Sequence, residues 1–99
     1  MAAYTVTFRF HEDSTYQTRY ESFVKEASKG LWWADPTSFF AIQTDETIDA
    51  LTTRLDTNTT ILKDRDMFMV MDADAKSARI WGKVLDKDVF KIIPYLKAV

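Results

Sequence analysis

The fold is decided by residues 4–13, YTVTFRFHED, in which apolar and polar side chains alternate with the period of a β-strand. Successive side chains of a strand point to opposite faces of its sheet. One face of this strand is apolar and must meet the core; its side chains are Val6, Phe8 and Phe10. The other face carries two threonines and Arg9, so we expect Arg9 to point to solvent or to a partner.

Length and composition predict one domain spanning residues 1–99, since 46% of the 99 residues are hydrophobic. The chain has no cysteine, which excludes disulfides and thiolate chemistry. Its beginning lacks a basic segment followed by a long apolar run, and no apolar run approaches the roughly 20 residues that span a bilayer. We therefore expect a cytoplasmic protein with no membrane partner.

The net charge of −2 hides an uneven distribution. Residues 1–75 carry 7 basic and 13 acidic side chains, whereas residues 76–99 carry 6 basic and 2 acidic ones. A basic end of this kind is typical of a solvated helix face, and its alternative role is nucleic-acid contact. The residues that would make this contact are Arg79, Lys83, Lys87 and Lys91.

Apolar stripes at helical spacing predict two long helices. Ser14 caps the first, with Gln17 reaching back in a capping box, and Gly30 ends it in the left-handed conformation. Its stripe comprises Tyr16, Tyr20, Phe23, Val24 and Ala27. Thr44 or Asp45 caps the second helix. Its stripe comprises Ile48, Leu51 and Leu55.

The other segments predict strands and one more helix. Strands are expected around residues 32–33 and over residues 38–43, 66–72 and 79–83, with a turn at Asp35-Pro36. Asp86 caps a last helix over residues 89–93. The order of elements predicts an α+β fold of the ferredoxin-like, split βαβ type. We expect a four-stranded antiparallel sheet with two helices on one face, plus a short C-terminal strand and helix.

Three methionines alternate with apolar residues in the segment 66–72, so this strand is apolar on both faces: Met67, Met69 and Met71. We expect a second subunit to cover this row, and the alternative is cover by the chain's own C-terminal helix. Arg9 is expected at the same interface, in an ion pair with an acid across strands or subunits; its alternative partner is a phosphate. Of the adjacent Trp32 and Trp33, one is expected in the core.

Two groups of residues are candidates for chemistry. His11 and Asp13 lie just past the first strand, and Asp72 and Asp74 follow the methionine strand. A histidine beside acids suits general-base or metal chemistry, and paired carboxylates suit Mg²⁺. Both groups are also typical of solvated turns, which is the interpretation we favour. We therefore predict no metal site and no confident catalytic residue.

Residues 32–72 resemble a group of small ferredoxin-fold proteins similar to the second CRISPR-associated adaptation protein and often labelled SinR-like. The resemblance rests on a tryptophan after the first helix, on Thr44-Asp45 at the end of an aromatic strand, on Asp56 and Asn58, and on a late Trp81-Gly82. It implies a homodimer with the two sheets packed against each other. In the CRISPR members it implies double-stranded DNA held across the dimer.

Some members of that group are metal-dependent nucleases, with an aspartate at the end of the first strand as the proposed metal ligand. Arg9 occupies this place here, and a guanidinium has no acceptor for a cation. We therefore expect a non-catalytic homodimeric scaffold or interaction domain without a cofactor. One alternative is a Mg²⁺-dependent nuclease of RNA or DNA that uses His11, Asp13, Asp72 or Asp74. The other is a nucleic-acid binder without catalysis.

Overall fold

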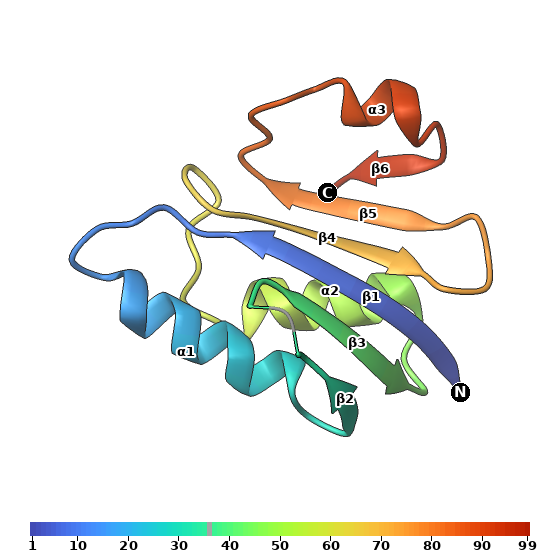
Figure 1. Cartoon of the computed structure of the whole chain (residues 1–99), viewed down its shortest axis with the longest axis horizontal. Helices are drawn as coiled ribbons and strands as arrows, with labels where there is room; N and C mark the ends of the chain where they lie inside the picture. Colours follow the sequence, from blue (N-terminus) through green and yellow to red (C-terminus); the bar gives the residue numbers. More distant parts are fainter. Residues whose placement is uncertain (36) are drawn as a thin grey trace.

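A six-stranded mixed sheet organises the computed structural model, which describes residues 1–35 and 37–99 (Figure 1). The elements along the chain are β1 (Ala2–Arg9), α1 (Tyr16–Ala27), β2 (Leu31–Trp33), β3 (Phe39–Thr44), α2 (Ile48–Thr57), β4 (Met67–Asp72), β5 (Ala78–Gly82), α3 (Val89–Ile92) and β6 (Leu96–Ala98). The strand order is β2-β3-β1-β4-β5-β6, antiparallel throughout except for the parallel pair β5–β6. None of the helices described here is long and apolar enough to cross a membrane.

The α+β class is confirmed, but the predicted four-stranded antiparallel sheet is wrong. The segment expected as an appendage pairs antiparallel with the free edge of β4, with Met69 opposite Ile80, and so extends the sheet as β5. The chain then returns through α3 and adds β6 parallel to β5. Unpaired backbone groups at a sheet edge favour such additions. Three residues of β6 are too few to give a recognisable pattern in the sequence.

The core lies between the sheet and the first two helices, which Figure 1 shows side by side, while α3 lies next to β6. The predicted inward face of β1 is confirmed, because Val6, Phe8 and Phe10 are buried. The core also receives Phe23 from α1 and Phe68 from β4, whose rings lie 5.5 Å apart. The opposite face of the sheet carries Thr5, Thr7 and Arg9; we call it the open face.

The C-terminal segment covers one end of the open face. Ala78, Ile80 and Leu96 are buried there, and the methionine row packs against them. Side chains from the α3 region complete this cluster: Val84, Val89, Phe90, Ile93 and Tyr95. The methionines are therefore half-buried by their own chain, as the alternative to a second subunit predicts. That a second subunit covers the part of the methionine row that is still exposed stays a prediction.

The helix boundaries correct three predicted caps. Thr15, not Ser14, precedes α1, and Gln17 bonds to Glu21 instead of reaching back. Thr47 caps α2 by accepting a hydrogen bond from the Ala50 N–H at 3.1 Å, so Thr44 and Asp45 do not. Asp88 precedes α3, and Asp86 accepts the N–H of Asp88 at 3.0 Å in the turn before it. Every predicted cap lies one to three residues early, because polar loop residues near a helix start are alike in sequence. A turn was also predicted at Asp35-Pro36, and Pro36 lies outside the described residues.

Two glycines adopt the left-handed backbone conformation. Gly30 follows α1, as predicted, with φ of 82°, and Gly82 ends β5 with φ of 94°. A Cβ at Gly30 would come no closer than 3.7 Å to the Gln43 oxygen. A Cβ at Gly82 would lie 2.0 Å from the main-chain oxygen of Asp66, closer than any real contact. Gly82 thus allows β5 to approach the chain just before β4.

Gly82→Ala is expected to destabilise the fold far more than Gly30→Ala. Both changes place a side chain in a left-handed conformation, which costs about 1–2 kcal/mol. At Gly82 the clash with a backbone atom brings the total to roughly 2–5 kcal/mol. Chemical denaturation of the two variants measures the difference in the free energy of unfolding, and equal losses would contradict the close approach described here.

Candidate functional site

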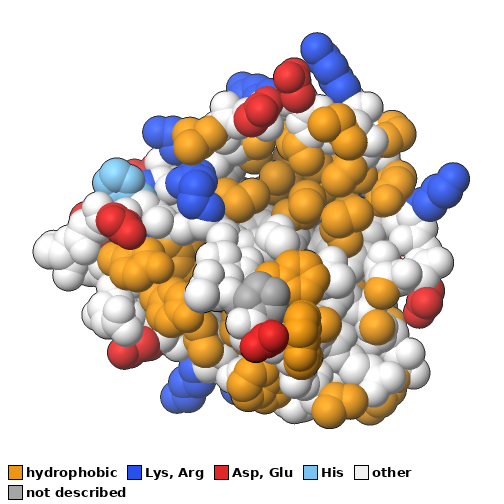
Figure 2. Space-filling view, in the orientation of Figure 1, with side chains coloured by type: hydrophobic (Ala, Val, Ile, Leu, Met, Phe, Trp, Pro, Cys, Tyr) orange, Lys and Arg blue, Asp and Glu red, His pale blue; other side chains and the backbone are white. Residues whose placement is uncertain are grey.

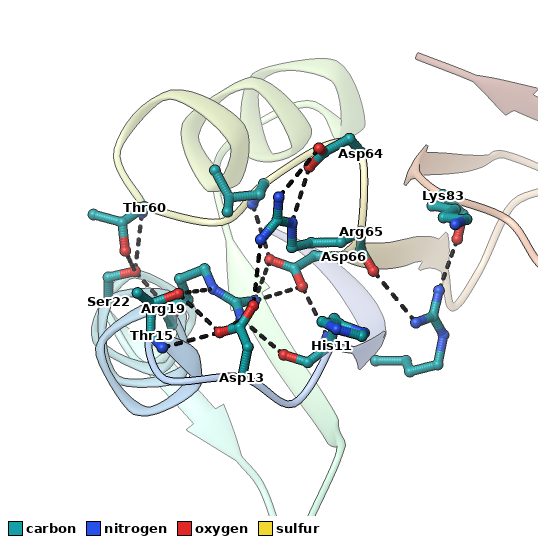
Figure 3. Close-up of polar contacts among 12 residues, drawn as sticks. His11, Asp13, Thr15, Arg19, Ser22, Thr60, Asp64, Arg65, Asp66 and Lys83 are labelled. Atoms are coloured by element: carbon teal, nitrogen blue, oxygen red, sulfur yellow. Dashed lines mark hydrogen bonds and ion pairs between the residues drawn. The ribbon is translucent and has the colours of Figure 1, made fainter.

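An ion pair between Arg19 and Asp66 lies at the centre of a polar cluster where β1 ends (Figure 3). Asp66 precedes β4 in phase with the inward-facing Phe68 and is 0% exposed; Arg19 projects from α1 and is 2% exposed. The Nη1 of Arg19 donates to both carboxylate oxygens of Asp66, at 2.6 and 2.7 Å. Two opposite charges are therefore buried together at the edge of an aromatic core.

All five N–H groups of Arg19 have acceptors. Besides the two bonds to Asp66, Nε donates to the Thr15 hydroxyl at 3.1 Å, and Nη2 donates to the His11 carbonyl and to Oδ1 of Asp13, each at 2.7 Å. Burial lowers the pKa of the Arg19 guanidinium, but the bonds from Asp66 and Asp13 outweigh burial and raise it. Arg19 is therefore a permanent cation with no donor left for a ligand.

Asp66 forms hydrogen bonds to three separate segments of the chain. Its carboxylate accepts the main-chain N–H of His11 and that of Leu62, both at 2.9 Å, which fixes the β1–α1 and α2–β4 loops. Its main-chain oxygen accepts the N–H of Lys83 at 2.9 Å, just past Gly82. One residue thereby sets the position of the end of β1, the start of β4 and the end of β5.

Asp13, a candidate metal or catalytic residue, is occupied by this cluster. Its carboxylate accepts from Arg19, from both the N–H and the hydroxyl of Thr15 at 2.9 Å, and from Nη1 of Arg65 at 3.3 Å. These bonds, that of Arg19 above all, hold the pKa of Asp13 well below its ordinary value of 3.8. Asp13 is a structural acceptor here.

The other candidates for metal chemistry lie apart from Asp13. In the register of β1 with β4, Asp72 pairs with Tyr4 at one end, while Arg9 pairs with Met67 at the other. These ends are about 17 Å apart at 3.4 Å per residue. Asp72 accepts the N–H of Asp74 at 2.8 Å within a turn, as the favoured interpretation expected. The structure therefore does not bring the four candidate residues together, and within the described ranges no group of three metal-ligating side chains is arranged to hold an ion.

Of the predicted nucleic-acid residues, Arg79 lies apart from the three lysines. Arg79 points to the helix side of β5 and pairs with Asp49 of α2 at 2.7 Å. Lys83 lies past the end of β5, whereas Lys87 and Lys91 are exposed around α3. Lys91 lies 3.7 Å from Asp88. Only Lys83 joins the polar cluster.

Arg9 donates to carbonyl oxygens, not to an acid. Its Nη2 bonds to the Lys83 oxygen at 2.8 Å and its Nη1 to the Arg65 oxygen at 3.4 Å. The expected ion pair across strands is therefore wrong for the single chain, because the nearest acceptors are the carbonyls before β4 and after β5. Arg9 lines a hollow of about 460 Å³, which we call the Arg9 hollow. Its other lining residues are His11, Asp64, Arg65, Lys83 and Leu85.

A second candidate surface lies on the open face over β2 and β3. Trp33 is 53% exposed and Leu31 67%, and the Trp33 ring meets Phe39 edge-on with centroids 6.3 Å apart. Trp32, on the helix side, is 49% exposed beside Phe40, so neither tryptophan is in the core and that expectation is wrong. Figure 2 shows hydrophobic side chains gathered over β2 and β3 and, separately, over the C-terminal segment.

Comparison with protein-family models, with curated proteins and with solved structures gave no match for this chain. The resemblance to CRISPR-associated adaptation proteins therefore stays a prediction, and the site has to be interpreted from its own geometry.

Arg19→Met is expected to destabilise the protein by about 3–5 kcal/mol, because it leaves the Asp66 carboxylate buried without its counter-charge. Arg65→Met is the matched control, since Arg65 belongs to the same cluster with a side chain that is 41% exposed. We expect its effect to be a small fraction of that of Arg19→Met. Urea denaturation of both variants tests this order, and similar losses would show that burial of the pair is not what matters.

Asp13→Asn is expected to reduce the dependence of stability on pH. The folded pKa of Asp13 lies below its ordinary value of 3.8, so its contribution is complete above about pH 5 and is lost as the pH falls through and below 4. The unfolding free energies of wild type and Asp13→Asn should therefore differ at pH 7 and converge toward pH 2. Glu12→Gln, at the exposed neighbouring residue, is the control. A gap between wild type and Asp13→Asn that stays constant down to pH 2 would contradict the role assigned to Asp13.

Proposed function

We propose that this domain is a non-catalytic homodimeric interaction module whose two copies pack their open faces together. The observation that carries the proposal is an uncovered stretch of sheet without charged side chains, bordered by exposed Trp33 and Leu31. Its residues are Ala3, Thr5, Thr7, Leu31, Trp33, Phe39, Ala41 and Gln43, and we call it the open-face patch. An apolar surface of this kind on a small domain is typical of an interaction site.

The shape of the patch suits a second copy of itself. Thr5 and Thr7 of β1 are short side chains in the middle of the sheet. On one side of them lie the larger side chains of Trp33 and Phe39, and on the other lie the methionine row and α3. A twofold axis parallel to the strands and between β1 and β3 would place the aromatic side of one copy against the threonines of the other. Such a self-complementary pairing is what a twofold interface requires.

Charge also favours self-association over a charged partner. A twofold axis brings like residues near one another, so a charged face would repel its own copy. The patch contains apolar residues, two threonines and Gln43 but no charged residue, although 28% of the chain is charged. Arg9 lies at the end of this strand row, where the carbonyls of Arg65 and Lys83 hold it.

The size of the patch sets a limit on the geometry. From β2 to β1 it spans two strand spacings, about 10 Å, and the stretch from Ala3 to Thr7 of β1 extends about 14 Å. The flat area is therefore about 140 Å². A stable interface of roughly 600 Å² per partner must then use the whole patch and also the half-buried methionine row of β4 beside it. Face-to-face packing of sheets is also what the resemblance implies.

Trp33→Arg is expected to convert the dimer to a monomer, because it places a charge in the interface. Trp32→Arg is the matched control: it changes the neighbouring residue, of similar exposure, on the opposite face of the same strand. Sedimentation velocity over a range of protein concentrations gives the dissociation constants. We expect at least a hundredfold weakening for Trp33→Arg and little change for Trp32→Arg.

Two results would contradict the proposal. A wild-type protein that stays monomeric at high micromolar concentration excludes the dimer. Equal weakening by Trp32→Arg and Trp33→Arg would place the interface at the edge of β2 and not on the open face.

A further inference from the structure

We propose that the Arg9 hollow binds a phosphate monoester through Arg9, Lys83 and His11. This inference concerns a site within one chain and is independent of the proposed dimer. The hollow, about 460 Å³, falls within the size range of small-molecule sites. It is larger than a phosphate group alone, so the anion would carry a small organic body, with Leu85 as an apolar contact for it.

The charges around the hollow are unbalanced. Arg19 and Arg65 are paired, because Asp66, Asp13 and Asp64 share them. Among the residues that the structure describes, Arg9 and Lys83 have no carboxylate partner. Two unpaired cations therefore line one hollow of a chain whose net charge is −2. Counted together, four cations meet three carboxylates here, which leaves an excess of one positive charge, and an anion is the ligand that this excess fits.

Arg9 is held ready to bind. Its bonds to the carbonyls of Lys83 and Arg65 use one N–H on each Nη, and three of its five N–H groups stay available. These carbonyls fix the guanidinium without neutralising it. A donor already fixed in place loses less entropy when its ligand arrives. Arginine is also the residue whose planar group best matches phosphate oxygens.

The remaining lining residues favour an anion over a cation. Asp64 is the one carboxylate among them, and Nε and Nη2 of Arg65 bind its two oxygens at 3.2 and 3.3 Å. These bonds keep the pKa of Asp64 low and satisfy its charge. His11 adds an N–H donor, and its main chain is anchored by Asp66. A divalent metal ion would meet two unpaired cations in this hollow.

The test is a titration of the isotope-labelled chain, followed by NMR, with inorganic phosphate and with phenyl phosphate as probes. Chloride at matched ionic strength controls for salt. We expect saturable shifts at the amides of His11, Arg65 and Lys83 and at the Arg9 side-chain N–H, with tighter binding of phenyl phosphate than of inorganic phosphate. Shifts that do not saturate with either probe, or that chloride reproduces, would overturn the proposal.

Variants locate the site. Arg9→Gln and Lys83→Gln should each weaken phenyl phosphate binding at least tenfold, whereas Lys87→Gln, an exposed cation outside the hollow, should leave it unchanged. Because Lys83 is exposed, its variant keeps the test valid even if Arg9→Gln disturbs the fold. Wild-type affinity in Lys83→Gln would overturn the assignment. Saturation only by a single-stranded oligonucleotide, with a steep salt dependence, would also overturn it and replace it with nucleic-acid binding.

Discussion

Burial of the Arg19–Asp66 pair is the constraint on which the surrounding structure depends. Removing two charges from water costs several kcal/mol per ion, and their attraction repays this only when the remaining donors and acceptors are satisfied. Here the guanidinium has acceptors from Thr15, His11 and Asp13 besides Asp66. Burial of the pair is therefore energetically acceptable only when the loop after β1 supplies these acceptors. This requirement fixes the conformation of the loop.

The same constraint reaches the Arg9 hollow through the backbone. The main chain of Asp66 binds Lys83, and Gly82 lets β5 come close enough for this bond. The carbonyls of Arg65 and Lys83, which flank this contact, are the acceptors of Arg9. The buried pair thus places both strands that hold the Arg9 guanidinium, although none of its own groups faces the hollow. The hydrogen bond between the Asp66 oxygen and the Lys83 N–H therefore connects the buried ion pair to the proposed anion site.

The alternation of residues 4–13 was sufficient to predict which face of β1 is buried, and helical spacing was sufficient for both long helices. The buried charges were missed, although the sequence contains a signal for them. Arg19 and Glu26 are seven residues apart and fall on the apolar stripe of α1, and Asp66 is in phase with Phe68 and Val70. A charged residue in phase with a core stripe indicates a buried partner. Which residue is the partner depends on tertiary packing.

The C-terminal end was harder to predict for a different reason. The residues of β5 alternate, but alternation does not say which edge a strand will join. Once β5 lies on β4, Ile80 and Ala78 extend the methionine row and make an apolar surface that the chain itself must cover. The α3 region supplies this cover. The pairing of β5 with β4 therefore determines both the number of strands in the sheet and which part of the chain covers the methionines.

A second ion cluster also lies on the helix side of the sheet, away from the open-face patch. Arg54 of α2 binds both oxygens of Glu46 at 2.8 and 2.9 Å and the main-chain oxygen of Glu26 at 2.7 Å. Burial raises the pKa of Glu26, but Lys29, Arg54 and Asn58 lower it further than burial raises it. Each end of α1 is therefore fixed by a guanidinium and a carboxylate on the helix side of the sheet.

Ionic contacts that hold the helices in this way need no charged residue on the other side of the sheet. Thr5 and Thr7 occupy the centre of that side, where a lysine or glutamate would protect a permanently exposed sheet surface from association. Tertiary structure here does not require these threonines, since their side chains point away from both helices. Their small size and lack of charge are what the proposed packing of a second copy against them requires.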